Sequence, residues 1–301
     1  MDLVAAADRP PRPGETVLGR DFSLCPGGKG ANQAVAASRL GAETTFLGVV
    51  GEDAFGEILL KNLRDAGVRL AVRRDSTAST GVAMIVVQPG GQNSIVVAPG
   101  ANRLCSAEDL HRHEQLFREA DAVLLQLEIP LETVERALEL ARSAGAKSVL
   151  DAGPPTKLCS ELLSKADLVS PNETETQAIT GIEVDDMDSG KAAAKRLIEM
   201  GAARAALKLG ERGALLCWEQ GVQHFPAAPV EAVDTTAAGD AFTAALAVQW
   251  AGGAALNEAL EYACYAGAAA VMTFGAQPSM PTAQEVEALM RRFPPVGRQR
   301  G

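Results

Sequence analysis

The sequence predicts an α/β fold, in which a mostly parallel central sheet is covered by helices on both faces and carries a small β-sheet lid. Two observations predict this three-layer αβα sandwich. Apolar runs with the length of strands alternate with helical segments along most of the chain, and a β-rich part at residues 80–98 breaks that alternation. Strands that alternate with helices need crossover connections, which place a largely parallel sheet between two helical layers.

Short apolar runs mark the strands, and glycines mark the ends of the helices between them. The predicted strands are residues 44–50, 122–127, 147–151, 167–170 and 204–210. Three helical segments carry apolar side chains at helical spacing and stop at Gly67, Gly145 and Gly201. Glycine is common at this position because it adopts positive φ without strain. The pattern contains no long linker and predicts one main domain.

The β-rich pieces predict the lid. Residues 81–87 and 93–98 are separated by residues 88–92, whose proline and two glycines are typical of a hairpin turn. Residues 16–24 are β-like as well and have no helix of their own. We therefore expect a β lid of residues 12–25 and 80–98, beside an α/β domain of residues 1–11, 26–79 and 99–301.

Composition and charge exclude several classes of protein. The chain of 301 residues has a formal net charge of -10, which argues against a general nucleic-acid binder because such a protein needs a basic face. No apolar run reaches the roughly 18 residues that a membrane span needs. The five cysteines form no C-x-x-C pair, which predicts free thiols in a reducing compartment. We therefore expect a cytoplasmic protein.

The loop at residues 233–242 combines small residues with two aspartates, Asp234 and Asp240. It precedes a segment of helical composition, so its small residues would leave several backbone N–H groups unpaired at a helix start. Such a nest suits a phosphate in transfer, and Asp240 at its end could take a proton from an attacking hydroxyl. The alternative is an aspartate that only caps a helix, and spacing alone leaves the two interpretations equal.

A second cluster, residues 26–34, leads into an alanine-rich helix. Its glycines let a ligand approach the backbone closely, and Lys29 and Asn32 offer hydrogen-bond donors to hydroxyl groups. The order of residues does not match the G-x-x-x-x-G-K-[ST] pattern of a Walker A loop. The alternative is a flexible strand-to-helix turn with a solvated lysine.

Three further polar segments follow predicted strands: residues 126–128, 171–175 and 208–213. Ligands of parallel sheets bind at the carboxyl ends of the strands, so Glu128 could contact a ligand and the carboxylates of 171–175 could hold a metal. The glycines of 208–213 could accept a flat or phosphorylated ligand. The alternatives are an ordinary loop carboxylate, a helix start with acidic residues on its dipole, and a plain β-turn.

Taken together, these segments resemble the ribokinase family of carbohydrate kinases, in family order from Asp2 to about Pro281. The resemblance is carried by residues 13–16, 27–34, 100–102, 126–128, 172–175, 234–240 and 275–279. Segments 27–34 and 234–240 are highly specific as a pair. The resemblance implies a ribokinase-like fold that phosphorylates D-ribose at O5 with ATP, giving ribose 5-phosphate. It also implies a lid that closes the sugar pocket and often pairs across a homodimer.

The resemblance further implies roles for individual residues. Asp240 looks like the catalytic base that deprotonates the primary hydroxyl of the sugar. The backbone anion hole around the transferring phosphate would be Ala237, Ala238 and Gly239. The positions that match sugar contacts are Asp2, Gly28, Lys29, Gly30, Ala31, Asn32, Glu128 and Asp240.

The same resemblance implies binding sites for nucleotide and ions. The positions that match the nucleotide site are Asn172, Lys208, Leu209, Gly210, Glu211, Arg212, Gly213, Ala238, Gly239 and Cys264. Asn172 and Glu175 match the motif that supports Mg²⁺ and phosphate, through water. The positions that match the K⁺ loop, mostly through backbone carbonyls, are Asp234, Thr236, Ala270, Thr273, Gly275 and Ser279.

Two features depart from the family pattern. The family opens with a buried strand that ends in an Asn just before the Met1-Asp2-Leu3 step, and neither stands in this sequence. We therefore expect exposed apolar sheet surface and the loss of one contact that chooses among sugars, through either a misassigned start codon or a weakened kinase. Cys264 stands where relatives often carry Asn or His near the adenine, which predicts weaker adenine binding because a thiol is a poor hydrogen-bond partner.

Two alternative functions stay open. A related sugar or nucleoside kinase, such as a deoxyribokinase or a fructokinase, would carry the same motifs. A non-catalytic ligand-binding relative is the second alternative. The retention of Asp240 with Ala237, Ala238 and Gly239 argues against the second, and the absent first strand argues for it.

Overall fold

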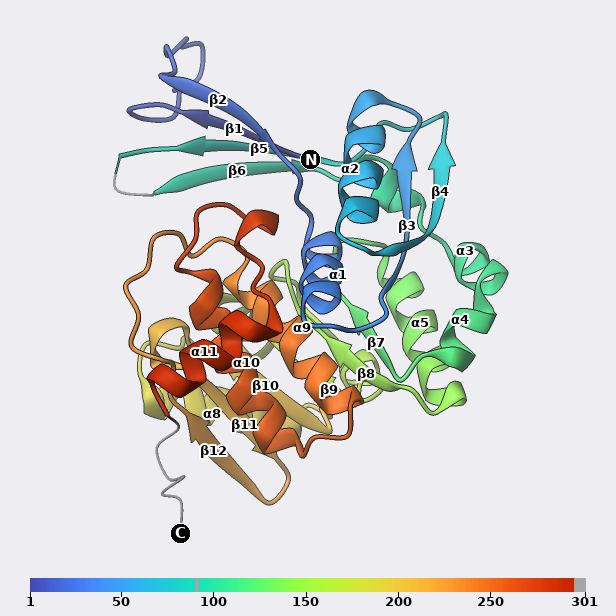
Figure 1. The fold of residues 1–301 in the computed structure, drawn as a ribbon, viewed down its shortest axis with the longest axis vertical. Coiled ribbons are helices and arrows are strands. Elements are labelled where there is room, and N and C mark those ends of the chain that lie inside the picture. Colours follow the sequence, from blue (N-terminus) through green and yellow to red (C-terminus); the bar gives the residue numbers. More distant parts are fainter. Residues whose placement is uncertain (90–91, 295–301) are drawn as a thin grey trace.

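The computed structural model describes residues 1–89 and 92–294, and it shows a layered α/β body with a β-sheet projecting from one end (Figure 1). The main sheet has six strands in the order β12-β11-β10-β9-β8-β7. Neighbouring strands from β7 to β10 are parallel, whereas β11 and β12 are added antiparallel as a hairpin. The strands are β7 (Ala122–Leu125), β8 (Lys147–Leu150), β9 (Leu168–Val169), β10 (Arg204–Lys208), β11 (Ala214–Trp218) and β12 (Gly221–Phe225).

Eleven α-helices are present in the described residues. They are α1 (Lys29–Arg39), α2 (Ala54–Asp65), α3 (Ala107–Arg112), α4 (Glu114–Glu119), α5 (Leu131–Ala144), α6 (Ser160–Leu163), α7 (Glu173–Thr180), α8 (Met187–Glu199), α9 (Ala238–Ala251), α10 (Leu256–Ala270) and α11 (Ala283–Arg292). Three short 3₁₀ helices are also described: η1 (Gly100–Leu104), η2 (Gly210–Arg212) and η3 (Gln277–Ser279). No helix among the described residues has both the length and the apolar character that crossing a membrane requires.

Two hydrophobic cores cover the two faces of the main sheet, as the predicted three-layer sandwich requires. Successive strand residues point to opposite faces. Along β8, Leu150 therefore packs into the core that includes α5 and α8, while Val149 packs into the core that includes α9, α10 and α11. The α/β sandwich is thus confirmed.

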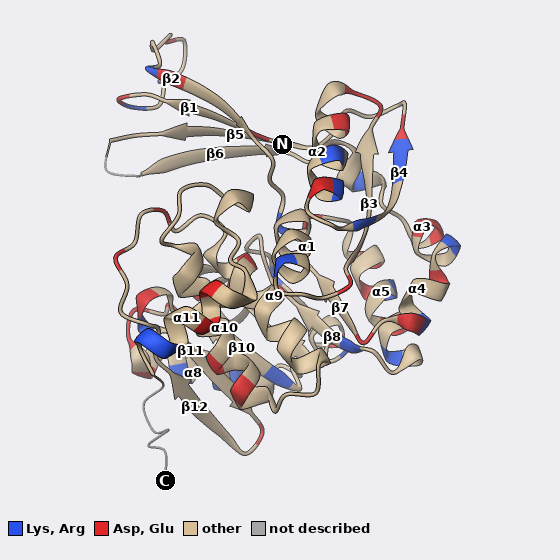
Figure 2. Ribbon diagram, viewed as in Figure 1, with Lys and Arg blue, Asp and Glu red and all other residues tan. Residues whose placement is uncertain are grey.

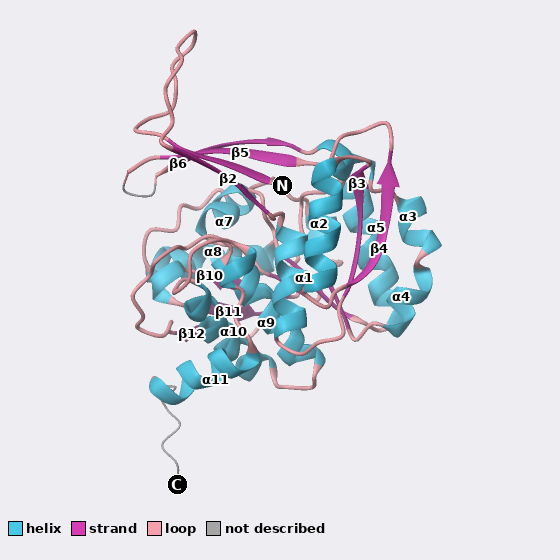
Figure 3. Ribbon diagram, turned by 45° about the horizontal axis from the view of Figure 1, so that its top comes forward, coloured by secondary structure: helices cyan, strands magenta, loops and turns pink. Residues whose placement is uncertain are grey.

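The lid is a four-stranded sheet in the order β2-β1-β5-β6. Its strands are β1 (Asp2–Ala6), β2 (Asp21–Cys25), β5 (Val82–Val87) and β6 (Asn93–Ala98). In Figure 3 these strands extend past the helices of the body. The sequence analysis placed residues 2–6 in the α/β domain. In the structure they form β1, which lies between β2 and β5 of the lid and pairs with both. The predicted hairpin turn falls partly on residues 90–91, outside the described residues.

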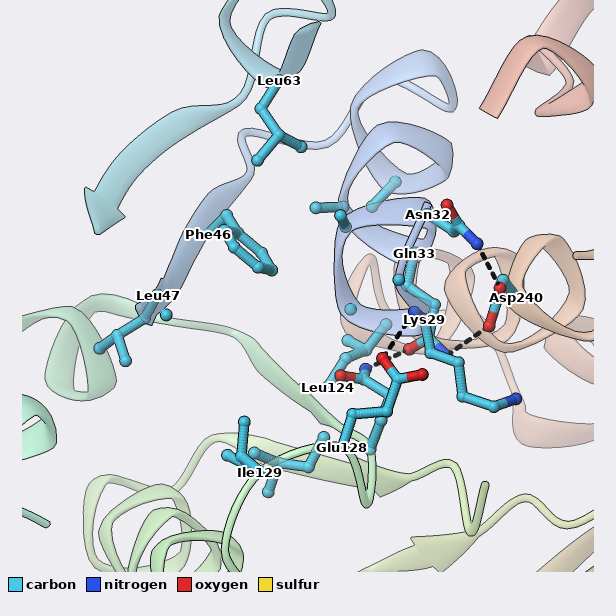
Figure 4. A pocket seen from close by; sticks show the side chains of 18 of the residues that line it. Lys29, Asn32, Gln33, Phe46, Leu47, Leu63, Leu124, Glu128, Ile129 and Asp240 are labelled. Atoms are coloured by element: carbon cyan, nitrogen blue, oxygen red, sulfur yellow. Dashed lines mark hydrogen bonds between the residues drawn. The ribbon is translucent and has the colours of Figure 1, made fainter. Parts of the chain in front are cut away.

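The central sheet is interrupted. Strands β3 (Thr45–Gly51) and β4 (Arg69–Asp75) form a separate parallel pair, so β3 and β7 are both edge strands. A cavity of about 1490 Å³ lies between them and is lined by Phe46 and Leu47 on one side and by Leu124 on the other (Figure 4). The side chains of Phe46, Leu47 and Leu124 are apolar and partly buried. Strand β4 was not predicted, because three arginines interrupt its apolar pattern.

The five cysteines are free, as the sequence predicted. Cys105, Cys217 and Cys264 are buried, whereas Cys159 is exposed. The buried thiols pack as small apolar side chains.

Candidate functional site

Polar residues gather where the strands end, at the wall of the same cavity. Lys29 and Asn32 lie on the first turns of α1, Glu128 follows β7, and Asp240 lies on the first turn of α9 (Figure 4). With Asp2, these residues converge from segments far apart in the sequence. The structure therefore brings together the polar side chains that the sequence analysis assigned to the sugar and to catalysis.

Asp240 is a buried carboxylate with two amide donors. Asn32 Nδ2 donates to Asp240 Oδ2 at 2.9 Å, and Gln33 Nε2 donates to Oδ1 at 3.1 Å. Burial raises the pKa of Asp240 above its ordinary value, Lys29 opposes the shift, and Asp151 adds to it. A buried carboxylate that is a stronger base than an exposed one suits proton abstraction.

The helix that carries Asp240 begins in an unusual backbone conformation. Ala237, the N-cap of α9, has φ 59° and ψ 12°, the only described residue other than glycine with positive φ. This conformation is strained for a residue with a Cβ atom. It turns the chain sharply into α9, whose first-turn N–H groups belong to Ala238, Gly239 and Asp240.

The cluster of residues 27–32 is shaped around carboxylates. Lys29 N donates to Glu128 Oε2 at 2.9 Å, and Lys29 Nζ lies 3.6 Å from Glu175 Oε1. Burial opposes the charge of Lys29, yet Asp151, Asp240, Glu175 and Glu128 together raise its pKa. Lys29 is therefore a fixed cation among buried carboxylates and not the solvated lysine of the alternative interpretation.

Two glycines let the chain pass between acidic side chains. A Cβ atom at Gly27 would lie 2.1 Å from Asp2 Oδ2, so no larger residue fits there without moving Asp2. Gly28 has φ 96°, which favours glycine, and it precedes α1 directly. Burial raises the pKa values of Asp2 and Glu128.

Two side chains of the turn between β10 and β11 point into the protein. Lys208 and Leu209 are buried, and Lys208 Nζ pairs with Asp151 Oδ2 at 3.2 Å, so neither side chain faces outward from the turn. Gly210 and Gly213 have positive φ, and Arg212 reaches Glu173 Oε1 at 3.4 Å.

Cys264 is buried on α10. Its Sγ lies 3.8 Å from the carbonyl of Phe225, and burial raises its pKa to about 12. The thiol therefore stays protonated and packs against β12.

Asn172 and Glu175 form a reciprocal capping box at the start of α7. Asn172 Oδ1 accepts from Glu175 N at 2.8 Å, and Glu175 Oε2 accepts from Asn172 N at 2.8 Å. The helix-start alternative is thus what the structure shows, although Glu175 Oε1 also faces Lys29. Across the described ranges, no three His, Cys, Asp or Glu residues cluster in a way that could hold a metal.

The residues of the expected K⁺ loop come from two segments that touch. Asp234 Oδ2 accepts from Gly275 N at 2.8 Å, and Asp234 Oδ1 accepts from the backbone and the hydroxyl of Thr236. The Val271 carbonyl accepts from Asp234 N at 3.1 Å. Ala270, Thr273 and Ser279 lie on the same stretch as Gly275, so the set lies on two segments that the Asp234–Gly275 hydrogen bond joins.

The sequence analysis gave no individual role to Gln33, Asp151 or Gln126. Asp151 is the last residue of the strand run 147–151 and Gln126 opens the polar segment 126–128, so their positions at strand ends were visible. Gln33 stands beside Asn32 in the 26–34 cluster, but nothing in the sequence showed that its side chain reaches both Asp151 and Asp240.

Comparison with known proteins shows to which family the chain belongs. The model of the pfkB family carbohydrate kinases matches residues 1–283. The chain is 40% identical over 291 residues to the ribokinase of Bacillus subtilis, covering 96% of each protein. It is 36% identical to the deoxyribokinase of Salmonella typhi, covering 95% of this chain and 94% of the relative.

Solved structures agree. The structure of Arabidopsis thaliana ribokinase complexed with ribose and ATP superposes with a TM-score of 0.88 at 35% identity, covering 96% of this chain and 95% of that one. Fold, motif order and near-complete coverage point the same way, and the chain therefore belongs to the pfkB family of carbohydrate kinases.

Proposed function

We propose that the protein transfers the terminal phosphate of ATP to O5 of D-ribose and so makes ribose 5-phosphate. The observation that carries this proposal is the buried Asp240 carboxylate, held by two amides at the start of α9 and beside Lys29. The Bacillus subtilis relative is named a ribokinase, and the Arabidopsis thaliana ribokinase structure is a complex with ribose and ATP. These names support ribose as acceptor and ATP as donor.

In the proposed reaction Asp240 is the general base. The O5 oxygen attacks the terminal phosphorus, its proton passes to Asp240, and the bond from that phosphorus to the bridging oxygen breaks to release ADP. General-base help of this kind contributes about 10²–10⁴ in rate. Phosphoryl transfer otherwise depends on positioning and charge stabilisation, which the rest of the site supplies.

Sugar hydroxyls would bind to Asp2, Lys29, Asn32 and Glu128. Asn32 is 5% exposed, and its Oδ1 has no hydrogen-bond partner within the described residues. A buried amide oxygen without a partner is costly, and a sugar hydroxyl would satisfy it. The backbone of Gly28, Gly30 and Ala31 would give the sugar close access to the start of α1.

The phosphate would lie at the N-terminus of α9. The N–H groups of Ala237, Ala238 and Gly239 would form the anion hole, where the helix dipole adds positive potential. Ala238 N donates to the Thr235 carbonyl at 3.3 Å, a long bond that a phosphate oxygen would replace. The adenine end of ATP would lie along the β10–β11 turn, toward Cys264.

Two ions would complete the site. Glu175, with Asn172 beside it, would hold Mg²⁺ through water, since Mg²⁺ keeps several waters and needs few carboxylates. Bound Mg²⁺ would neutralise charge on the phosphates. For K⁺, the Asp234 carboxylate and backbone carbonyls of the 270–279 segment form an oxygen donor set that suits a hard cation, and the Asp234–Gly275 bond brings them together. Bound K⁺ would stiffen the loop that precedes the anion hole.

We also place the protein in the cytoplasm as a homodimer that pairs through its lid. Five free cysteines suit a reducing compartment. The lid carries exposed apolar side chains on its two edge strands, β2 and β6, and Figure 2 shows β5 and β6 in the colour of uncharged residues. The clearest are Phe22, Ile95, Val96 and Val97, each more than half exposed. Apolar patches of this kind mark interaction surfaces.

The experiment that tests the function is ATP turnover with Mg²⁺ and K⁺ on ribose, deoxyribose, fructose and adenosine, run beside Asp240→Asn. Ribose-dependent ADP release that falls by about 10²–10⁴ in the variant supports both substrate and base. Asp109→Asn is the matched control, because Asp109 is an equally buried carboxylate that pairs with Arg73 outside the site. Preference for deoxyribose would replace the ribose assignment, and no turnover on any sugar by folded protein would refute the kinase assignment.

A further inference from the structure

The side chain of Gln33 joins two buried carboxylates. Gln33 is 1% exposed, and its Nε2 donates both to Asp151 Oδ2 at 2.8 Å and to Asp240 Oδ1 at 3.1 Å. Its Oε1 accepts from Gln126 Nε2 at 2.5 Å. Two ionised carboxylates can only accept, so the amide must present its NH₂ group to them. The orientation of the Gln33 amide is therefore fixed.

Asp151 is the hub behind this amide. It is fully buried, and its Oδ2 accepts from Gln33, from Lys208 Nζ at 3.2 Å and from Thr243 Oγ1 at 3.2 Å. Asp151 Oδ1 has no partner within the described residues. Lys208 supplies the cation that a buried carboxylate needs, since an unpaired buried charge is strongly unfavourable.

Lys208 also runs beneath the N-terminus of α9. Its Cδ and Nζ atoms each lie 3.6 Å from the place of a Cβ atom on Gly239. One side chain thus reaches both the hub and the helix end that carries the base.

We propose that Gln33, Asp151 and Lys208 are positioning residues for Asp240, in which the Gln33 amide fixes the plane of the base and Lys208 balances the charge of Asp151. The proposal rests on the proposed function of Asp240 and extends it to three residues outside the proposed sugar contacts. With Asn32 on Oδ2 and Gln33 on Oδ1, the carboxylate is held at both oxygens. Each oxygen keeps a lone pair with which to receive the proton.

The charged groups around the two aspartates fit these roles. The charged groups around Asp240 and Asp151 are Lys29 of α1, Glu128 after β7 and Lys208 of β10, while Glu175 of α7 faces Lys29. Asp151 raises the pKa of Asp240, after the larger effect of burial. The negative hub is therefore coupled electrostatically to the base.

The first test is Gln33→Leu, which keeps the size of the side chain and removes the bridge. We expect kcat for ribose to fall about 10²-fold with both KM values within about threefold, because misplacing a reacting group costs that much without changing substrate contacts. The matched control is Thr243→Val, which removes another donor from the same Asp151 oxygen without touching Asp240. Its loss in kcat should be at least about tenfold smaller.

The second test separates positioning from simple stability. Lys208→Met leaves Asp151 unpaired, and we expect a fall in kcat of about 10²-fold in the folded enzyme. Asp151→Asn combined with Lys208→Met removes both charges, and kcat should recover to within about tenfold of the unmodified enzyme. A merely structural ion pair would change the melting temperature of these variants and leave kcat per folded molecule unchanged.

The outcomes are distinct. If the unmodified enzyme turns over no sugar, the proposed function fails before the variants are compared. If it turns over ribose while Gln33→Leu keeps its kcat, or while Thr243→Val loses as much as Gln33→Leu, the positioning role is wrong and the base assignment stands. Failure of the double variant to recover would overturn the role of Lys208.

Discussion

Asn32 Nδ2 lies 2.9 Å from Asp240 Oδ2, although the two residues are 208 positions apart in the chain. This bond joins the first turn of α1 to the first turn of α9, two helices that pack against each other at the edge of the cavity. The same side chain turns its partnerless Oδ1 away from that bond. One amide thus orients the proposed base and offers an acceptor to the sugar, so binding and chemistry share a residue.

The acid limb of the pH–rate profile should lie above the ordinary range of an aspartate. Burial raises the pKa of Asp240, and the base works only when ionised, so kcat should fall as pH decreases through that raised pKa. Asp151→Asn removes a charge that raises it further, so the limb should move to lower pH. The measurement is kcat against pH for both proteins, and a limb that moves upward in the variant would contradict the coupling.

Replacing Ala237 by glycine should stabilise the protein. Ala237 holds φ 59°, where a side chain costs roughly 1–2 kcal/mol, and glycine regains most of this after its own entropy cost of about 0.5–1 kcal/mol. We expect a net gain of about 0.5–1 kcal/mol in the free energy of unfolding, measured by urea denaturation. Ala238→Gly is the matched control, because Ala238 opens the helix next door and should lose about 0.5–1 kcal/mol. Equal effects of the two changes would refute the strain argument.

A methyl group at Gly27 should weaken sugar binding. The added Cβ atom would lie 2.1 Å from Asp2 Oδ2 and 2.5 Å from Asp2 Cγ, so Asp2 must move. We expect KM for the sugar to rise about tenfold or more with a smaller change in kcat, as for a lost ground-state contact. The control is Gly190→Ala, whose Cβ would meet Leu215 at an ordinary 3.4 Å inside α8. Steady-state kinetics of the two variants decide the question, and an unchanged KM in Gly27→Ala would remove Asp2 from the sugar site.

Charging the lid should separate the proposed dimer. Ile95 and Val97 are 52% and 62% exposed on β6, and burying a charge between two apolar surfaces is unfavourable. Ile95→Glu with Val97→Glu should shift the mass in sedimentation equilibrium from dimer to monomer. The same pair of substitutions at Leu131 and Ile58, exposed positions on the body, should leave the mass unchanged. If both pairs of substitutions gave a monomer, the result would not identify the lid as the interface.

The sequence predicted the layers of the fold well, because alternation of apolar runs and helices is a local signal. Positions at strand ends and helix starts pointed to Lys29, Asn32, Glu128 and Asp240 one by one, whereas Asp2 and the gathering of all five followed from the family resemblance. Pairing of β1 with β2 and β5 was not visible, since the four apolar residues after Asp2 do not reveal which sheet they join.

The inward course of Lys208 and the bridge made by Gln33 were beyond the sequence for another reason. Lysine at the end of a strand reads as a solvent-facing side chain, and only tertiary packing shows that Asp151 draws it inward. Glutamine in a helix has no preferred partner. Its role depends on two carboxylates that stand 118 and 207 positions away.

Because β1 belongs to the lid, Asp2 lies on the lid, whereas Glu128 lies on the α/β body. A sugar held by both would act as a tether between lid and body, so occupancy and lid position would be thermodynamically linked. Whatever restrains the lid, including a second copy paired along β6, would then change sugar affinity at a distance. Dimer formation would then change the affinity of the pocket for sugar through the position of the four-stranded sheet.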